Sequence, residues 1–149
     1  MGYPEDLLEQ ANHLAHREPE RPKQASLRRA VSAAYYALFH LLIESAIKNW
    51  KPEAGRSELA KAFDHGHMRS ILQRDLGLRS GQMQDVAKAF AKLQDQRHQA
   101  DYRDEIVWSR TDVLSVLQLA ESAFSSWKEL ENSPEAQQVL VSFLVKARR

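Results

Sequence analysis

The stretch "LRRAVSAAYYALFHLL", residues 27–42, decides the fold. Read as a helix, it carries one continuous apolar face, made by Leu27, Val31, Ala34, Leu38 and Leu41. From residue 30 to residue 43 the chain is apolar on nearly every side, which is typical of a helix that other helices surround. We therefore expect a long central helix here, from about Pro22 to Trp50, ended by Pro52.

The flanking sequence predicts more helices and no strand, because its apolar residues recur at helical spacing. We expect long helices from Pro4 to before Pro19, from Gln82 to the end of "RHQADY", from Ser109 or Thr111 to beyond Trp127, and from Ser133–Pro134 to a basic end at Lys146, Arg148 and Arg149. The irregular part between them contains two possible short helices, Ser57–Phe63 and His67–Leu76, with Gly55, Gly66, Gly77 and Gly81 as breaks. The prediction is all-α: an up-and-down bundle of about five helices in a single domain over residues 1–149.

The composition is that of a soluble globular protein. The chain has 149 residues, of which 43% are apolar and 28% charged, and its 21 basic and 20 acidic residues nearly cancel. A polyanion would therefore have to bind a local cluster of cations. No cysteine is present, which excludes disulfides and thiolate metal sites. The start "MGYPEDLLEQ" does not resemble a signal peptide, and the apolar run is too short to cross a bilayer, so we expect a cytoplasmic protein without a membrane partner.

The candidate site lies in "DQRHQADYRDE", residues 95–105. An apolar stripe leads into it through Met83, Val86, Phe90 and Leu93, and the next position on that stripe is Arg97. A guanidinium is rarely buried unless it is paired, so Arg97 should lie at the rim of the bundle or meet a partner such as Asp101. It could equally mark the end of the helix and reach out to water.

Other polar residues are weaker candidates. His98 points about 100° away from Arg97 on a helix, so the two converge on one target only across a dimer axis. Tyr36 and His40 share one helix face and form either a satisfied core pair, half of a dimer interface or part of a ligand site. Asp64, His65 and His67 do not by themselves supply a metal site, so we expect neither metal nor cofactor. Trp50 and Trp108 either cover a groove or close the ends of the bundle.

Three pieces in this order resemble the HEPN family (higher eukaryotes and prokaryotes nucleotide-binding): "LRRAVSAAYYALFHLL", "FDHGHMRSIL" and "RHQADY", the last leading into a capped helix with "AESAF". The resemblance covers roughly residues 5–130. It implies a bundle of about five helices, a homodimer with a groove at its seam, and either metal-independent ribonuclease activity or binding of RNA or nucleotides. It also implies a nucleotidyltransferase partner protein in a toxin–antitoxin-like module.

The sequence departs from that family at the catalytic histidine. Catalytic members have an arginine followed five to seven residues later by a histidine, whereas here Tyr102 stands five residues after Arg97. Tyrosine is a poor base near neutral pH, but an arginine can still hold a phosphate through two hydrogen bonds. We therefore expect an RNA- or nucleotide-binding protein with a degenerate nuclease motif, using Arg97, Asp101 and Tyr102 with Tyr36 and His40 behind them. The alternatives are an active ribonuclease, with Arg97, His98 and Tyr102 as the catalytic candidates, and a non-catalytic structural or protein-interaction module.

Overall fold

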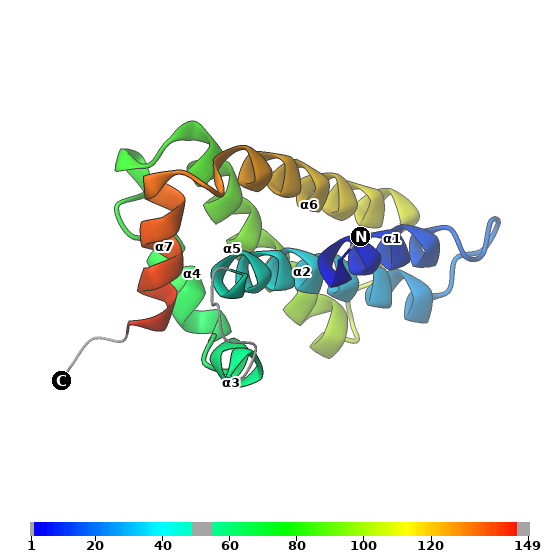
Figure 1. Ribbon diagram of the computed structural model, residues 1–149. Helices are drawn as coiled ribbons and strands as arrows, with labels where there is room; N and C mark the ends of the chain where they lie inside the picture. The colour runs from blue at the N-terminus through cyan, green and yellow to red at the C-terminus, as the bar shows by residue number, and fades with distance from the viewer. Residues whose placement is uncertain (1, 49–54, 146–149) are drawn as a thin grey trace.

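The computed structural model describes residues 2–48 and 55–145, and in this part of the chain every regular element is helical. Seven α-helices and one short 3-10 helix, η1, follow one another (Figure 1). Their bounds are α1 Tyr3–Ala15, α2 Gln24–Ile47, α3 Arg56–Lys61, α4 His65–Gln73, η1 Leu76–Leu78, α5 Gly81–Tyr102, α6 Arg110–Leu130 and α7 Pro134–Leu144. The prediction of an all-α bundle is confirmed, and the count of about five included only the long helices.

α2 is the central helix, as its apolar surface predicts. It contacts α1, α5, α6 and α7, and α7 crosses one end of the bundle near α4 (Figure 1). All five residues of the predicted apolar face are buried. The predicted end of this helix at Trp50 and Pro52, and the basic end of the last helix at Lys146, Arg148 and Arg149, lie outside the described residues.

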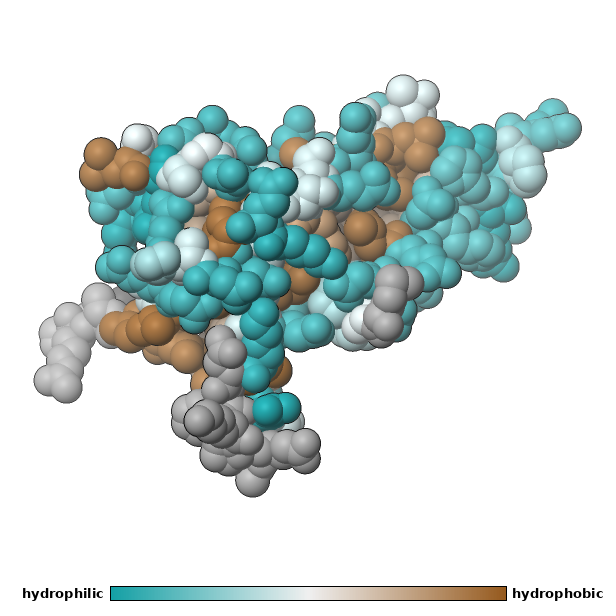
Figure 2. All heavy atoms as spheres, turned by 45° about the horizontal axis from the view of Figure 1, so that its top comes forward, coloured by the Kyte–Doolittle hydropathy of each residue, from teal (hydrophilic) through white to brown (hydrophobic). Residues whose placement is uncertain are grey.

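The length of α2 exceeds the 14-residue apolar run on which the expectation about a membrane rested. By length and composition alone, its 24 residues would suffice to cross a bilayer. Central helices of soluble proteins meet the same criterion, and 61% of the most apolar window of α2 is buried inside the protein. The face that carries α6 is covered mainly by hydrophilic side chains, with smaller apolar patches between them (Figure 2).

Local capping explains most helix starts. Ser109 caps α6, where its side chain accepts from the backbone of Asp112 and the Asp112 carboxylate accepts in return. Ser133 caps α7 in the predicted way. The prediction that Gly66 lies in a break is wrong, because it occupies the first turn of α4, whereas Gly81 stands at the predicted boundary as the first residue of α5. There the capping side chains, that of Asp64 for α4 and a serine for α5, fix the helix start next to glycine.

Two arginines bind the ends of helices to the rest of the bundle. Arg110 donates from Nε to the Ala15 carbonyl at 2.9 Å and also reaches the carbonyls of Glu18 and Pro19, beyond the end of α1. Arg28, on α2, does the same for the end of α5, as described below. Long side chains from neighbouring helices thus satisfy carbonyl groups that a helix end leaves without donors.

Trp108 closes the core at the connection between α5 and α6. It is 6% exposed, and its backbone N–H and carbonyl both bond to the side chain of Gln24, at 2.9 and 2.7 Å. Of the two alternatives for Trp108, the structure shows that it closes an end of the bundle and does not cover a groove. Trp50, for which the same alternatives were open, lies outside the described residues.

Candidate functional site

Arg97 is held at the rim of the bundle among three tyrosine rings. Its guanidinium carbon lies 5.6 Å from the ring centroid of Tyr35, 5.5 Å from that of Tyr36 and 5.9 Å from that of Tyr102. The first two rings belong to α2 and the third to the end of α5. The Arg97 side chain is only 15% exposed. The side chain that breaks the apolar stripe is therefore neither in bulk water nor in the core, and the rings favour its positive charge.

The hydrogen-bonding capacity of Arg97 is poorly used. Its nearest acidic partner is Asp101, with Nη1 and Oδ2 separated by 3.6 Å, which is too long for a good hydrogen bond. Its Nε is buried and has no acceptor among the described residues. A desolvated guanidinium with unused donors is well suited to an anion, which forms short charge-assisted hydrogen bonds.

The other candidates at the end of α5 surround this cation unequally. Asp101 accepts a hydrogen bond from the Ser32 hydroxyl at 3.3 Å, which links α5 to α2. Tyr102 is 65% exposed, so its ring presents an aromatic face to solvent beside the cation. His98 is exposed, and its ring centroid lies 5.0 Å from that of Tyr102. His98 therefore contacts a ring that contacts Arg97.

Arg28, and not Arg97, binds the carbonyl groups at the end of α5. Arg28 Nη1 donates to the carbonyls of Ala100 at 2.9 Å and Arg103 at 3.1 Å. Its Nη2 donates to the carbonyl of Asp104 at 3.3 Å and to that of Ile106. Arg97 is therefore not needed to end the helix, because Arg28 already binds the carbonyl groups at the end of α5.

His65, at the start of α4, is a member of this cluster that sequence reasoning did not select. Its Nδ1 lies 2.5 Å from the Tyr35 hydroxyl, and its ring stacks on Phe39 at 3.9 Å and 9°. Burial lowers the pKa of His65, and the positive charge of Arg97 lowers it further. Burial also raises the pKa of the Tyr35 phenol, which stays protonated. The contact joins residues 30 positions apart, and no spacing rule in the sequence predicts it.

The two neighbours of His65 in "DHGH" have structural roles. Asp64 caps α4, accepting from the backbone N–H groups of Gly66 and His67 at 2.9 and 3.1 Å. His67 Nε2 donates to the carbonyls of Ser142 and Val145, at the end of α7. Within the described residues, no three acidic, histidine or cysteine side chains are grouped so that they could hold a metal ion.

A second cation close to the cluster is already neutralised. Arg69, on α4, forms two hydrogen bonds with the carboxylate of Asp95, at 2.7 and 3.2 Å, and a third with Gln94 at 3.1 Å. The hydrogen bond to Asp95 raises the pKa of Arg69. Arg97 is thus the cation of this cluster that retains unused donors.

Tyr36 and His40 line a cleft of about 360 Å³ between α1 and α2. Both are half-buried, and the His40 ring contacts that of Tyr3, from α1, with the centroids 5.0 Å apart. Burial lowers the pKa of His40. Because Tyr36 also contacts Arg97, the cleft and the cation meet at this tyrosine. The pair is thus not sealed in the core.

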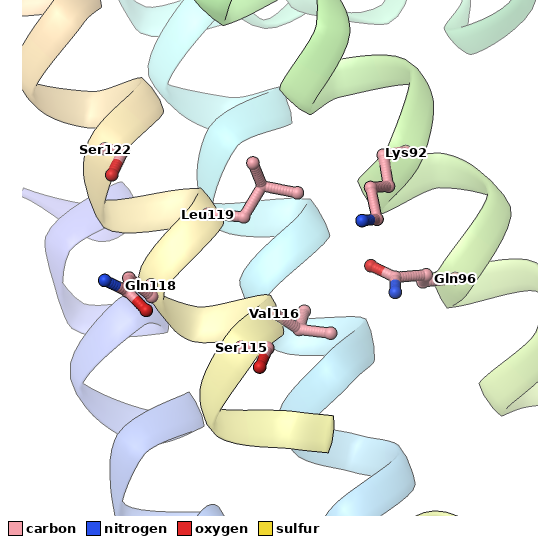
Figure 3. A pocket seen from close by; sticks show the side chains of 7 residues that line it. All are labelled: Lys92, Gln96, Ser115, Val116, Gln118, Leu119 and Ser122. Carbon is pink, nitrogen blue, oxygen red and sulfur yellow. The ribbon is translucent and has the colours of Figure 1, made fainter. Parts of the chain in front are cut away.

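A second cleft, of about 290 Å³, lies between α5 and α6 and has a different character (Figure 3). The Lys92 amine and the Gln96 amide lie together on the α5 wall, facing Val116 and Leu119 on the other. The Gln96 Oε1 is buried without a partner among the described residues. Among the described residues, no aromatic side chain and none of the residues predicted for the site lines this cleft. Its lining is Lys92, Gln96, Ser115, Val116, Gln118, Leu119 and Ser122.

Comparison of the chain with models of protein families, with curated proteins and with solved structures gives no match in any of the three.

Proposed function

We propose that this chain is a HEPN-like domain that binds the phosphate of an RNA or nucleotide at Arg97 and does not cleave it. The observation that carries the proposal is the state of Arg97: mostly desolvated, ringed by tyrosines, and with a buried Nε that lacks an acceptor. A phosphate oxygen is a good acceptor for such a group, and an exposed tyrosine beside it offers a face on which a base can stack. The family resemblance supports the same ligand class.

The test compares two cations on one helix. Arg97→Met removes the cation at the site and keeps a long side chain, whereas Lys92→Met removes a charge of the same sign from the other cleft. With inorganic pyrophosphate and adenosine diphosphate as probes in calorimetric titrations, Arg97→Met should weaken binding about tenfold or more, because hydrogen bonds to charged groups contribute roughly 1.5–3 kcal/mol each. Lys92→Met should leave binding unchanged.

The stability of the same variants separates binding from a structural role. Because the Arg97–Asp101 pair is long and Arg28 holds the end of α5, Arg97→Met should change the free energy of unfolding by less than about 1 kcal/mol. A loss of several kcal/mol with unchanged affinity would instead establish a structural or protein-interaction module.

His65 favours a second candidate, a metal-independent ribonuclease. Its hydrogen bond to Tyr35 brings a titratable imidazole to the rings that hold Arg97, where a histidine could accept the proton of an RNA 2′-hydroxyl. This candidate predicts degradation of RNA in the presence of a chelator, lost in His65→Gln and kept in His98→Ala. Intact RNA after prolonged incubation with concentrated protein would eliminate it.

The partners follow from the resemblance alone. We infer a homodimer in the cytoplasm, a nucleotidyltransferase as partner protein in a toxin–antitoxin-like module, and no membrane association. Sedimentation velocity of the purified chain tests the first of these, since a dimer has twice the monomer mass. A nucleotidyltransferase that co-purifies with the chain from its native cells would support the second.

A further inference from the structure

The cleft between α1 and α2 has an aromatic end and a cationic end. At the aromatic end, Tyr3 is 58% exposed, and its ring meets that of His40 edge-on, at 71°. Tyr36 follows along the α2 wall, with its ring 6.3 Å from that of His40. Arg29 stands at the other end, seven residues before Tyr36 and therefore about 10 Å away along the helix axis.

Two residues connect the cleft with the Arg97 site. The Tyr36 ring lines the cleft and also lies 5.5 Å from the Arg97 guanidinium. Ser32, another lining residue, donates to the Asp101 carboxylate, which is paired with Arg97. A ligand group bound at Arg97 would thus lie next to Tyr36, whose ring also lines the cleft.

The charged residues on the two sides of the cleft favour one orientation of a bound nucleotide. Arg29 is exposed and makes no hydrogen bond or ion pair with any residue in the described ranges, so it remains available to an anion. The opposite rim belongs to α1, where Asp6 and Glu9 line an adjoining hollow with Tyr3. Phosphate is attracted to the α2 and α5 side and repelled from the α1 side, so the uncharged part of a nucleotide is favoured next to Tyr3.

We propose that the cleft between α1 and α2 is a nucleoside-binding subsite, which takes the base of a nucleotide whose phosphate lies at Arg97, with Arg29 placed for a neighbouring phosphate. This inference rests on the proposed function and adds a base-stacking surface made by Tyr3 and Tyr36. A dinucleotide should therefore bind more tightly than pyrophosphate, since stacking of one base on an aromatic side chain strengthens binding by roughly 5- to 150-fold.

Two variants and one control variant test the subsite. Tyr3→Ala removes a ring that is 58% exposed, and Ala33→Leu fills the cleft from its α2 wall. Ser122→Leu is the matched control, because it fills the cleft between α5 and α6 in the same way. The probes are inorganic pyrophosphate and a 5′-phosphorylated diadenosine ribonucleotide, titrated into each variant after its melting temperature has been checked.

The expected result is that Tyr3→Ala and Ala33→Leu each weaken dinucleotide binding about tenfold and leave pyrophosphate binding unchanged, whereas Ser122→Leu alters neither. Equal affinity of the unaltered protein for the two probes, with no effect of either variant, would overturn the subsite and leave the phosphate site standing. Failure of the unaltered protein to bind either probe would overturn the proposed function itself. A change in sedimentation in Tyr3→Ala, with dinucleotide binding intact, would show that the cleft is a subunit contact and would also overturn the subsite.

Discussion

Replacing Arg28, a half-buried residue of α2, by methionine should destabilise the fold substantially. Its guanidinium bonds to four carbonyl groups around the end of α5, and the bonds to Ala100 and Ile106 are partly buried. In the variant, water can reach the two exposed carbonyls, but the two partly buried ones lose their donor. Each such loss costs about 1–3 kcal/mol, so the free energy of unfolding should fall by about 2–6 kcal/mol.

Urea unfolding followed by circular dichroism measures this change directly. For a chain of this size, each kcal/mol corresponds to roughly 2–4 °C, so the melting temperature should fall by roughly 4–24 °C. The stability of Arg28→Lys should lie between that of the unaltered protein and that of Arg28→Met, because one ammonium group cannot reach all four carbonyls. Arg29→Met is the control: the neighbouring arginine is exposed and free of hydrogen bonds to the described residues, so its loss should stay within about 0.5 kcal/mol.

Equal stability of Arg28→Met and Arg29→Met would refute this reasoning. It would mean that water replaces the guanidinium at every carbonyl. The end of α5 would then have to be held by contacts of its own, among which the pair of Arg97 and Asp101 is the first candidate. In that case Arg97 would have a structural role at the end of α5.

Further expected outcomes concern the histidines and the core. His67→Ala should cost about 1 kcal/mol, because two carbonyls at the end of α7 lose a donor, whereas His98→Ala at an exposed position should cost nothing measurable in urea unfolding. The folded-state pKa of His65 lies below its ordinary value of 6.5, so its contribution to stability is present above that pH and lost as the pH falls through the lowered pKa. Urea midpoints should therefore decline below pH 6.5, and less steeply in His65→Gln. Leu38→Ala, at a fully buried position, should cost about 2–5 kcal/mol.

The helices were predictable because their signals are local. The periodicity of α2 lies within one stretch of chain, and the caps of α6 and α7 lie within three residues of the groups that they satisfy. Gly66 misled for the same reason: a glycine suggests a break, yet this one is tolerated in the first turn of α4, whose start the Asp64 side chain defines. Short helices such as α3 and α4 depend on their neighbours, and only their approximate place could be predicted.

The candidate site was predictable only in part. Arg97 could be found because it interrupts an apolar stripe, and Asp101 because it follows four residues later. The contact of Tyr35 with His65 and that of Arg28 with Ala100 join positions 30 and 72 residues apart. Such contacts depend on how the helices pack against one another, and the spacing of residues along the sequence does not predict them. The sequence therefore indicated the cation and two of its three rings, those of Tyr36 and Tyr102, but not the Tyr35 ring, the His65 imidazole or Arg28.

The balance of interactions at Arg97 supports the proposed binding role over a structural one. Withdrawing a guanidinium from water is costly, and a long pair with Asp101 repays little of that cost. The three tyrosine rings recover about 0.5–2 kcal/mol each at such distances, but they leave the buried Nε without an acceptor. A methionine at this position would avoid the desolvation cost, so the folded state gains little from the arginine itself. An anion that supplies the missing acceptor would bind only the folded form and would stabilise it in proportion to its concentration, which is the behaviour of a ligand site.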